Sequence, residues 1–502
     1  MVEALRAMLK AGAGSVLSMG LGVLAMKVLA LVLGPSGVGL FSVLRQTQQV
    51  GVTLSVFNGQ MSIIQGVASR EKSAQGQYLA TVFWIVLLLT VATSLGLWLC
   101  SPWLASRLTE QGRGESPLMF RYLSVAVLFG AAQAFLTAVL NGRKAVGRVA
   151  WVQVISLGSM ALLAYPAAKL AKSGHPFALS GILAASAMLG TVAAFGLLLH
   201  EGSLGWLFRS PSRRPRREDA RSFLSMSGTL AITGLYGALI PLLVRAWAVQ
   251  RHGLHGAGIL DVAWTISLSY LMVILGSLSS YYLPTLSSTA AGPARAEVIG
   301  RMLRLILGFL CPIVVTAIVL KPVLLDLLYS RDFSPALKIM RWMMIGDFFK
   351  GVSWVFSFTM IAHSDMRTFL WSELTWGSAT LAASAVFILG AGSLEGVGIT
   401  YAALYVLYLL FTYAYAVRRY QFHLGSGTLK QGIVGACLVV AVSLWTWNDI
   451  RVSAWKSIAA ITVAALVSGF WILKGTRPFE VPRALSSGPL DGSGKSFTGG
   501  PL

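Results

Sequence analysis

Long apolar segments recur along almost the whole chain and leave little room for an ordinary water-soluble fold. With a window of about 19 residues, apolar spans fall near 12–33, 39–67, 78–100, 118–141, 146–168, 177–199, 223–249, 258–286, 302–328, 336–362, 368–390, 396–417, 431–447 and 454–473. A helix of about 20 apolar residues crosses the hydrocarbon core of a bilayer. Charged residues make up only 12% of the chain, against about 25% in a soluble protein. We therefore expect an all-α polytopic membrane protein with about fourteen transmembrane helices.

One polar, arginine-rich segment divides these spans. Residues 201–222 hold six arginines together with Pro211 and Pro215, so this segment is not a helix in lipid. We predict an N-terminal six-helix lobe at 1–200, a basic cytoplasmic linker at 201–222, a C-terminal six-helix lobe at 223–417, two additional transmembrane helices at 430–474 and a flexible cytoplasmic tail at 475–502. The first span is too long for a signal peptide and is expected to be retained.

The formal charge of the chain is +22. Too few aqueous residues remain for a nucleic-acid-binding domain, so we expect the basic side chains to lie in loops, beside lipid headgroups or in an internal cavity. Most of the Lys and Arg outside the spans fall on the N-terminal side of the predicted membrane, which predicts that both termini are cytoplasmic. The three cysteines are isolated, so we expect no disulfide framework and no metal site. The sequence Gly494-Lys-Ser496 lacks the preceding glycine and strand of a nucleotide-binding loop, and no cofactor is expected.

A glycine motif occurs twice at a constant offset. Gly34-Pro-Ser-Gly37-Val-Gly39 lies between the first two spans, and Gly253-Leu-His-Gly256-Ala-Gly258 lies 219 residues later. Each motif follows an intramembrane cation, Lys27 or Arg245. Because each lobe has an even number of spans, the two copies are expected to share one orientation and to be related by an axis along the membrane normal. Two such lobes would enclose a central cavity.

Ionised side chains inside the spans are the main candidates for function, since each costs roughly 2.5–3.5 kcal/mol to insert at the bilayer centre. The cations are Lys27, Arg45, Arg121, Arg245, Arg341 and Lys350. Arg121 and Arg341 lie near span ends and are expected to snorkel. The other four would give each lobe two inward cations, and guanidinium groups match phosphate oxygens in pairs. We therefore expect a cavity that binds phosphate or carboxylate; the alternative is a purely structural role in ion pairs.

The acids inside the spans are Asp261, Asp347 and Glu373. A poorly solvated carboxylate can load and release a proton as a cavity changes face, so these three are candidates for ion or proton coupling. They are also candidate partners of the cations, and Asp347 lies three residues before Lys350 on one helix. Asn58 is polar within an apolar segment and either bonds a neighbouring helix or binds the substrate.

Several of these residues lie in recognisable blocks. The stretch Val56-Phe57-Asn58-Gly59, the pair Arg45-Gln46 after Gly37-Val-Gly39-Leu40, and Tyr282-Leu-Pro-Thr-Leu-Ser287 resemble the Wzx-type polysaccharide flippases. Gly346-Asp347-Phe-Phe-Lys350, Ile361-Ala-His363 and Phe369-Leu-Trp-Ser-Glu373 are similar to the tenth and eleventh helices of the subgroup that flips lipid III. The blocks recur in the same order across about residues 10–417. This chain departs from the pattern at His363, where the subgroup has lysine, and in its two extra C-terminal helices.

The resemblance implies a MATE-like fold of the multidrug/oligosaccharidyl-lipid/polysaccharide exporter superfamily, with two lobes in a V around the cavity. It implies a cargo of undecaprenyl-pyrophosphate-linked oligosaccharide, an O-antigen or related repeat unit, moved from the cytoplasmic to the periplasmic leaflet of a bacterial inner membrane. Candidate partners are then membrane lipids and a polysaccharide polymerase or chain-length machinery, with the transporter itself a monomer. In this interpretation Lys27, Arg45, Asn58, Arg245 and Lys350 bind substrate, and Asp261, Asp347 and Glu373 serve coupling.

Three rival functions fit the sequence less well. A MATE-related exporter of cationic drugs would favour an acidic cavity rather than a basic one. A membrane glycosyltransferase or polymerase would need a carboxylate cluster and a large aqueous domain, whereas the acids here are scattered. A scaffold without transport would leave the buried cations unexplained. We therefore expect a transporter and not an enzyme.

Overall fold

The computed structural model describes residues 2–109, 116–200, 216–289, 293–363, 365–420, 422–447, 449 and 452–475, and every regular element within these ranges is helical. The predicted fold class is confirmed. The α-helices are α1 (Val2–Ser55), α2 (Gln60–Ala68), α3 (Lys72–Leu99), α4 (Ser101–Leu108), α5 (Ser116–Gly142), α6 (Val146–Lys172), α7 (Ala178–His200), α9 (Arg217–Ser288), α10 (Pro293–Leu328), α11 (Ala336–Ala362), α12 (Met366–Ala385), α13 (Glu395–Tyr420), α14 (Ser426–Trp445) and α15 (Ala454–Gly475). Short helical turns at Arg331–Phe333 and Val386–Gly390 complete the set.

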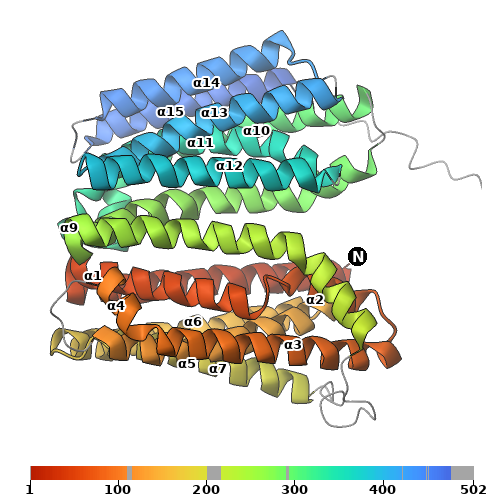
Figure 1. The fold of residues 1–502 in the computed structure, drawn as a ribbon. Coiled ribbons are helices and arrows are strands. Elements are labelled where there is room, and N and C mark those ends of the chain that lie inside the picture. Colours follow the sequence, from red (N-terminus) through yellow and green to blue (C-terminus); the bar gives the residue numbers. More distant parts are fainter. Residues whose placement is uncertain are drawn as a thin grey trace, which may run out of the picture.

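Helices α1 and α9 each reverse direction at a single glycine. Gly34 has φ 65° and ψ −165°, and Gly253 has φ 67° and ψ −175°. This region of backbone space is essentially restricted to glycine, because a Cβ atom would clash there. Figure 1 shows both reversals at the same end of the molecule, opposite the N-terminus. The repeated glycine motif therefore builds the same helical hairpin twice, 219 residues apart.

Within the part of the chain that the structure describes, eleven helices are long and apolar enough to cross a membrane. Two of them contain the reversals at Gly34 and Gly253 and so cross twice. Helix α11 has 27 residues and lies among the others, although Asp347 and Lys350 reduce its mean hydropathy. The helices thus make about fourteen passes, each near the length that a bilayer requires. The chain is a multi-pass membrane protein.

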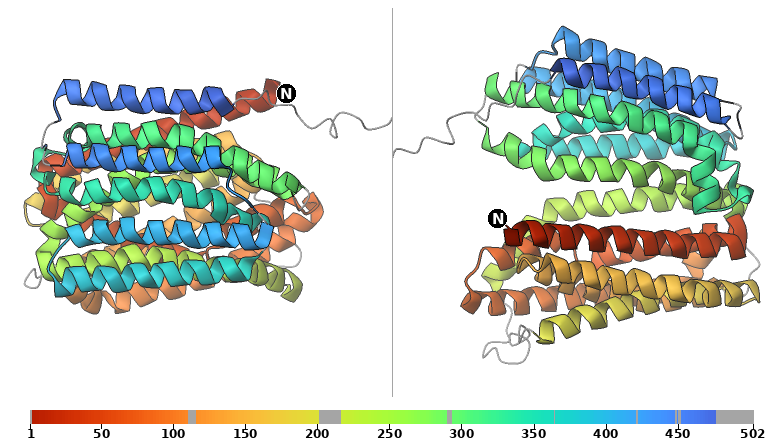
Figure 2. Two further views of the ribbon diagram at one scale, coloured as in Figure 1. Left: turned by 90° about the horizontal axis from the view of Figure 1, so that it is seen from above. Right: turned by 180° about the vertical axis from the view of Figure 1, so that it is seen from behind.

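The helices form two groups that lie one above the other in Figure 1, with α1 to α7 below and α9 to α15 above. Helices α14 and α15 pack on α10 at the outer side of the upper group, as the two further views show (Figure 2). Residues 201–215 of the predicted linker lie outside the described residues, and Arg217–Ser222 form the first turns of α9. The predicted tail beyond Gly475 also lies outside them.

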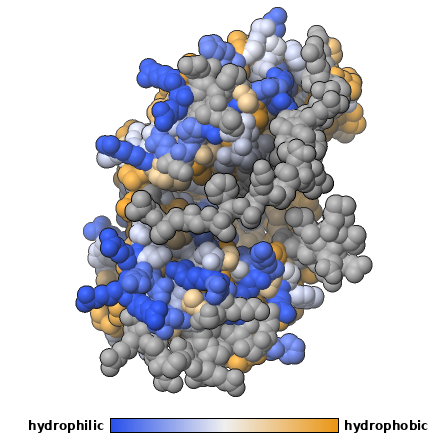
Figure 3. Space-filling model, turned by 90° about the vertical axis from the view of Figure 1, so that its right-hand side faces the viewer, coloured by the Kyte–Doolittle hydropathy of each residue, from blue (hydrophilic) through white to orange (hydrophobic). Residues whose placement is uncertain are grey.

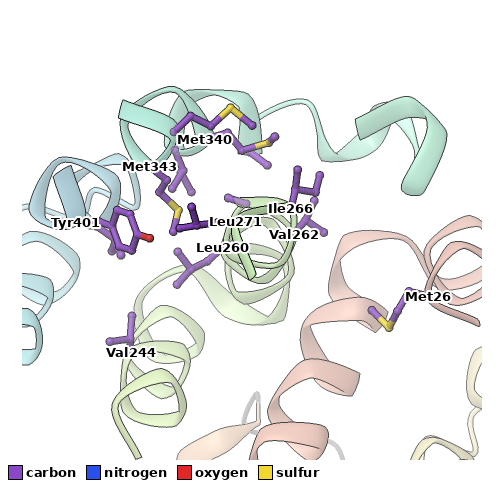
Figure 4. Packing of buried hydrophobic residues seen from close by; sticks show 14 of the residues in the cluster. Met26, Val244, Leu260, Val262, Ile266, Leu271, Met340, Met343 and Tyr401 are labelled. Atoms are coloured by element: carbon purple, nitrogen blue, oxygen red, sulfur yellow. The ribbon is translucent and has the colours of Figure 1, made fainter. Parts of the chain in front are cut away.

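The second half of α9 forms the centre of the larger hydrophobic core. Leu260 and Leu271 on α9 lie against Met340 and Met343 of α11, and Tyr401 of α13 points toward them (Figure 4). These side chains are almost wholly buried. The packing holds α9, α11 and α13 together, and these three helices also carry most of the buried polar side chains described below.

Hydrophilic side chains gather at the end of both helix groups that carries the N-terminus (Figure 3). The turn between α5 and α6, with Arg143 and Lys144, and the last turn of α13, with Arg418 and Arg419, reach this end by the up-and-down order of the helices. Polar side chains are expected where helices leave the hydrocarbon. That this end faces the cytoplasm stays a prediction.

Candidate functional site

The backbones of the two helix groups come into contact where their glycine motifs face each other. A Cβ atom on Gly39 would lie 2.0 Å from the carbonyl oxygen of Leu254, and one on Gly258 would lie 1.9 Å from that of Pro35. The two contacts are equivalent in the repeat, because both glycines and both carbonyls are 219 residues apart. Only glycine allows the backbones to come this close. The second halves of α1 and α9 therefore start side by side and carry the next turns of side chains into a shared interface.

Two arginines at this interface share one carboxylate. Arg245 donates to Oδ1 of Asp261 from Nη2 at 2.5 Å and from Nε at 3.1 Å, and its Nη1 donates to the carbonyl oxygen of Pro241 at 3.0 Å. The Nη2 atom of Arg45 lies 3.6 Å from the same Oδ1. Asp261 Oδ2 is buried and has no hydrogen-bond partner among the residues that the structure describes. We call Arg45, Arg245 and Asp261 the diarginine site; with two cations and one anion it keeps a formal charge of +1.

The diarginine site opens into a cavity of about 520 Å³ between the two groups of helices. Its wall consists of Met19, Arg45, Gln46, Pro241, Arg245, Trp264, Thr265, Leu268, Ser269 and Met272. The side chain of Arg45 is 38% exposed, whereas that of Arg245 is 6% exposed. The exposed guanidinium of Arg45 has most of its donors available, and a guanidinium binds phosphate or carboxylate through paired charge-assisted hydrogen bonds. The arrangement can hold an anion between the two groups.

A second cavity of about 380 Å³ lies within the C-terminal group, and we call it the aromatic cavity. Helices α9, α11, α12 and α13 enclose it, and its wall includes Tyr236, Pro241, Trp264, Lys350, Trp354, Glu373, Trp376, Tyr401, Tyr405 and Tyr408. Pro241 and Trp264 line both cavities. The guanidinium carbon (Cζ) of Arg245 lies 5.7 Å from the ring centroid of Trp264. The two cavities are therefore neighbours with a tryptophan between them.

Lys27 and Asn58 lie at opposite ends of the interface and join the two groups of helices. The Nζ atom of Lys27 donates to the carbonyl oxygens of Asp326, at 2.6 Å, and of Tyr329. These carbonyls lie at the C-terminal end of α10, where a helix favours a cation. Asn58 donates from Nδ2 to the carbonyl oxygen of Leu230 on α9 at 2.5 Å. The structure does not bring either residue into the two cavities, and their role in substrate binding stays a prediction.

The end of the interface near Asn58 has further contacts between the groups. Ser227 donates to Ser62 at 2.9 Å, and Arg70 pairs with Asp219 at 3.3 Å. Asn58 itself has φ 44°, a left-handed conformation that asparagine tolerates better than most residues. This turn ends α1 and starts α2, which explains why the single apolar span expected over 39–67 is divided. The two groups thus touch at both ends of the structure.

The three acids expected inside the spans differ in their surroundings. Asp347 is wholly buried and accepts hydrogen bonds from Ser267 at 2.7 Å, Tyr270 at 2.5 Å and Tyr401 at 2.8 Å. It forms no ion pair with Lys350, so the pairing that their spacing suggested does not occur. Three hydroxyl donors already satisfy the carboxylate.

Lys350 and Glu373 are the charged groups of the aromatic cavity. Lys350 is 7% exposed, and its Nζ lies 5.5 Å and 5.1 Å from the ring centroids of Tyr401 and Tyr405. Cation–π contacts of this kind stabilise a desolvated ammonium group. Among the described residues, neither the Lys350 ammonium nor the Glu373 carboxylate has a hydrogen bond or an ion pair.

The aromatic residues around the second cavity were not predicted from the sequence. Tyr401, Tyr405 and Tyr408 follow one another at intervals of four and three residues, which places them on one face of α13. Such a stripe is usually a packing face, so its spacing alone gives no functional signal. The cavity could have been predicted only by considering this tyrosine stripe together with the ionisable residues of α11 and α12.

Solved structures identify the class of fold. The chain matches the lipid II flippase MurJ in an inward closed conformation with a TM-score of 0.65, at 11% identity, over 93% of this chain and 98% of that one. It also matches an inward-facing multidrug resistance MATE transporter of the MOP superfamily with a TM-score of 0.56, at 14% identity, over 80% of this chain and 94% of that one. The protein has the fold of the MOP superfamily of transporters.

The sequence comparisons identify the family. The family model described as "Polysaccharide biosynthesis protein" matches residues 28–338, more than half of the chain, so the protein belongs to that family. The lipid III flippase of Escherichia coli (strain K12) is 25% identical over 413 residues, covering 80% of this chain and 95% of that protein. The lipid III flippase of Shigella flexneri matches to the same extent.

Proposed function

We propose that this protein is a flippase that moves an undecaprenyl-pyrophosphate-linked oligosaccharide, an O-antigen or related repeat unit, from the cytoplasmic to the periplasmic leaflet of a bacterial inner membrane. The observation that carries the proposal is the pair of arginines that face a cavity between two repeated halves and share one acid. The relatives named lipid III flippase support the same class of cargo. It acts as a transporter and catalyses no covalent step.

The main barrier to flipping such a lipid is the transfer of its polar headgroup through the membrane. A pyrophosphate and a glycan cannot cross about 30 Å of hydrocarbon unaided, whereas the polyprenyl tail is stable there. Arg45 and Arg245 would bind the phosphates while the tail stays in lipid. The remaining positive charge of the diarginine site opposes a cationic drug, which argues against the alternative function of a MATE-related multidrug exporter.

Transport requires the contacts at one end of the interface to open while those at the other end hold. The glycine contact and the Lys27 hydrogen bonds would close one end, and the hydrogen bonds of Asn58 and Ser62 would close the other. Rocking of two repeats about a central site is the usual form of alternating access. Lys27 and Asn58 would reach the headgroup only after their present contacts are broken.

Of the three acids considered for coupling, Glu373 is the best placed. Asp261 is held by two arginines and Asp347 by three hydroxyl groups. Glu373 has an exposed side chain in the aromatic cavity and no hydrogen bond or ion pair within the described residues. A carboxylate that is free to exchange a proton or to bind a cation is the one that can respond to a gradient.

The test is flipping by the purified protein in proteoliposomes, with undecaprenyl-pyrophosphate-linked oligosaccharide as cargo. Arg45→Ala should abolish the appearance of cargo in the opposite leaflet, and Arg418→Ala, which removes an exposed arginine on α13, should not. Normal flipping by both Arg45→Ala and Arg245→Ala would refute the binding site. Mass spectrometry of the lipids that accumulate in cells lacking the protein identifies the glycan.

The remaining features of the proposal are both termini in the cytoplasm, function as a monomer, and contact with a polysaccharide polymerase or its chain-length machinery. Cysteine labelling from either side of the membrane tests the first. The hydrophilic end of the molecule supports it, because the positively charged loops between helices tend to remain cytoplasmic (Figure 3).

A further inference from the structure

The aromatic cavity is placed beside the diarginine site but differs from it in chemistry. Trp264 and Pro241 belong to both walls, so the second cavity lies directly next to Arg45 and Arg245. The diarginine site holds a surplus cation. The aromatic cavity holds one cation, Lys350, and one anion, Glu373, and so has no formal surplus.

The wall of this cavity is unusually rich in flat side chains with a polar edge. Seven tyrosine and tryptophan residues line it: Tyr236, Trp264, Trp354, Trp376, Tyr401, Tyr405 and Tyr408. An aromatic face carries partial negative charge and attracts the weakly positive hydrogens of C–H groups. A pyranose ring presents C–H groups on its faces and hydroxyl groups around its rim, which suits such a wall.

Within the described part of the chain, the charged groups of the cavity have no hydrogen bond and no ion pair. Lys350 is more than nine-tenths buried, and its ammonium lies over the rings of Tyr401 and Tyr405. A buried ammonium without a hydrogen-bond acceptor is costly, so its persistence points to an acceptor supplied by a ligand. Glu373 could accept hydrogen bonds from the same ligand. Hydroxyl groups, which both donate and accept, match this pair of side chains.

Other ligands fit the cavity less well. A second phosphate would be repelled by Glu373, and a lipid tail would leave both charges unsatisfied. A drug-like cation would meet the buried charge of Lys350. The volume of about 380 Å³ lies within the range of about 300–1,000 Å³ that is typical of small-molecule sites.

We propose that the aromatic cavity is a sugar-binding subsite, which holds a pyranose ring of the cargo stacked on its aromatic wall while the phosphates lie at Arg45 and Arg245. Lys350 and Glu373 hydrogen-bond the hydroxyl or amide groups of that ring. This proposal rests on the proposed function for the nature of the cargo. It adds that the protein distinguishes cargos by the sugar that follows the phosphates, and not by charge alone.

The test compares two probes, undecaprenyl pyrophosphate without sugar and undecaprenyl-pyrophosphoryl-N-acetylglucosamine, bound to the full-length protein in nanodiscs. Binding is measured by native mass spectrometry or by quenching of tryptophan fluorescence. The wild type should bind the sugar-bearing probe at least tenfold more tightly. Trp376→Leu, which keeps apolar volume but removes the flat face, should reduce this preference to less than threefold and leave the affinity for undecaprenyl pyrophosphate within twofold.

Trp371→Leu is the matched control, because Trp371 lies on the same helix but is 61% exposed at the outer surface. Lys350→Met is a second variant, needed because Trp376 also packs on Tyr408 and Phe411. The subsite assignment is overturned if Trp376→Leu and Lys350→Met both lose affinity equally for the two probes. It is also overturned if neither variant loses the preference for the sugar-bearing probe. If the wild type does not bind undecaprenyl pyrophosphate, the proposal of a phosphate site at the two arginines is refuted. The sugar subsite is then tested separately, by comparing how tightly the wild type and the variants bind the sugar-bearing probe.

Discussion

Gly39 and Gly258 lie back to back across the interface of the two repeats, each within contact of the other repeat's backbone. A Cβ atom on either residue would come within about 2 Å of a carbonyl oxygen, at Leu254 or at Pro35. This contact sets the spacing at which Arg45 and Asp261 face each other further along the same helices. The ion pairs of the site therefore depend on the close approach of the two backbones.

Gly258→Ala should weaken this end of the interface. The added methyl group forces the two backbones apart, and overpacking of this kind typically costs about 1–3 kcal/mol. We expect a lower unfolding temperature, measured in detergent, and slower flipping, because the closed end no longer seals. Gly96→Ala is the control, since a Cβ atom at Gly96 meets nothing within 4 Å. Unchanged stability and transport in Gly258→Ala would show that the contact is not tight.

The two arginines should differ in their effect on stability although both are needed for transport. Arg245 is buried against Asp261, and its removal leaves a buried carboxylate with only Arg45 near it. Breaking a buried pair from one side typically costs about 3–5 kcal/mol. Arg245→Ala should therefore unfold at clearly lower temperature than the wild type, whereas Arg45→Ala should lose flipping with little change in stability.

The double variant Arg245→Met with Asp261→Asn separates these effects. Neutralising both partners removes the unpaired charge, so we expect it to be more stable than Arg245→Ala while it remains inactive. Thermal unfolding and proteoliposome flipping of the same preparations provide both readings. A double variant no more stable than Arg245→Ala would mean that the Arg245–Asp261 pair is not the source of the loss.

Glu373→Gln should uncouple flipping from an ion gradient. The amide keeps the shape of the carboxylate but cannot carry a proton or a negative charge. We expect the wild type to slow when the proton or sodium gradient across the proteoliposome membrane is dissipated, and the variant to flip at one low rate with or without a gradient. Asp347→Asn is the comparison and should mainly reduce stability, because three hydroxyl groups surround that carboxylate. An undiminished response to the gradient in Glu373→Gln would exclude it as the coupling group.

His363, which follows α11, should make stability depend on pH. Partial burial, and then the nearby Arg295 and Arg419, lower the pKa of His363 below its ordinary value of about 6.5. The folded protein thus disfavours the protonated form, so stability is retained above about pH 6.5 and decreases as the pH falls below it. His363→Gln should lessen this decrease. Thermal unfolding from pH 5 to pH 8 is the measurement, and parallel curves for wild type and variant would contradict the prediction.

Most of the fold could be predicted from the amino-acid sequence because membrane insertion is governed by local hydropathy. Each span is recognised by its own length and apolar content, independently of its neighbours. The two reversals could also be anticipated, since the motifs at Gly34 and Gly253 interrupt apolar segments at equal spacing in the repeat. Likewise, the cost of a buried charge marked Arg45, Arg245 and Lys350 as residues that need a partner.

What those charges contact could not be predicted in the same way, because a partner depends on which helices pack together. Lys27 meets carbonyl groups of α10 about 300 residues away, and Asp347 bonds hydroxyl groups of α9 and α13 instead of the adjacent Lys350. The aromatic cavity forms only where α9, α11, α12 and α13 converge. Hydropathy acts on each segment alone, whereas ion pairs and cavities arise from the packing of distant segments, and so they became visible only in three dimensions.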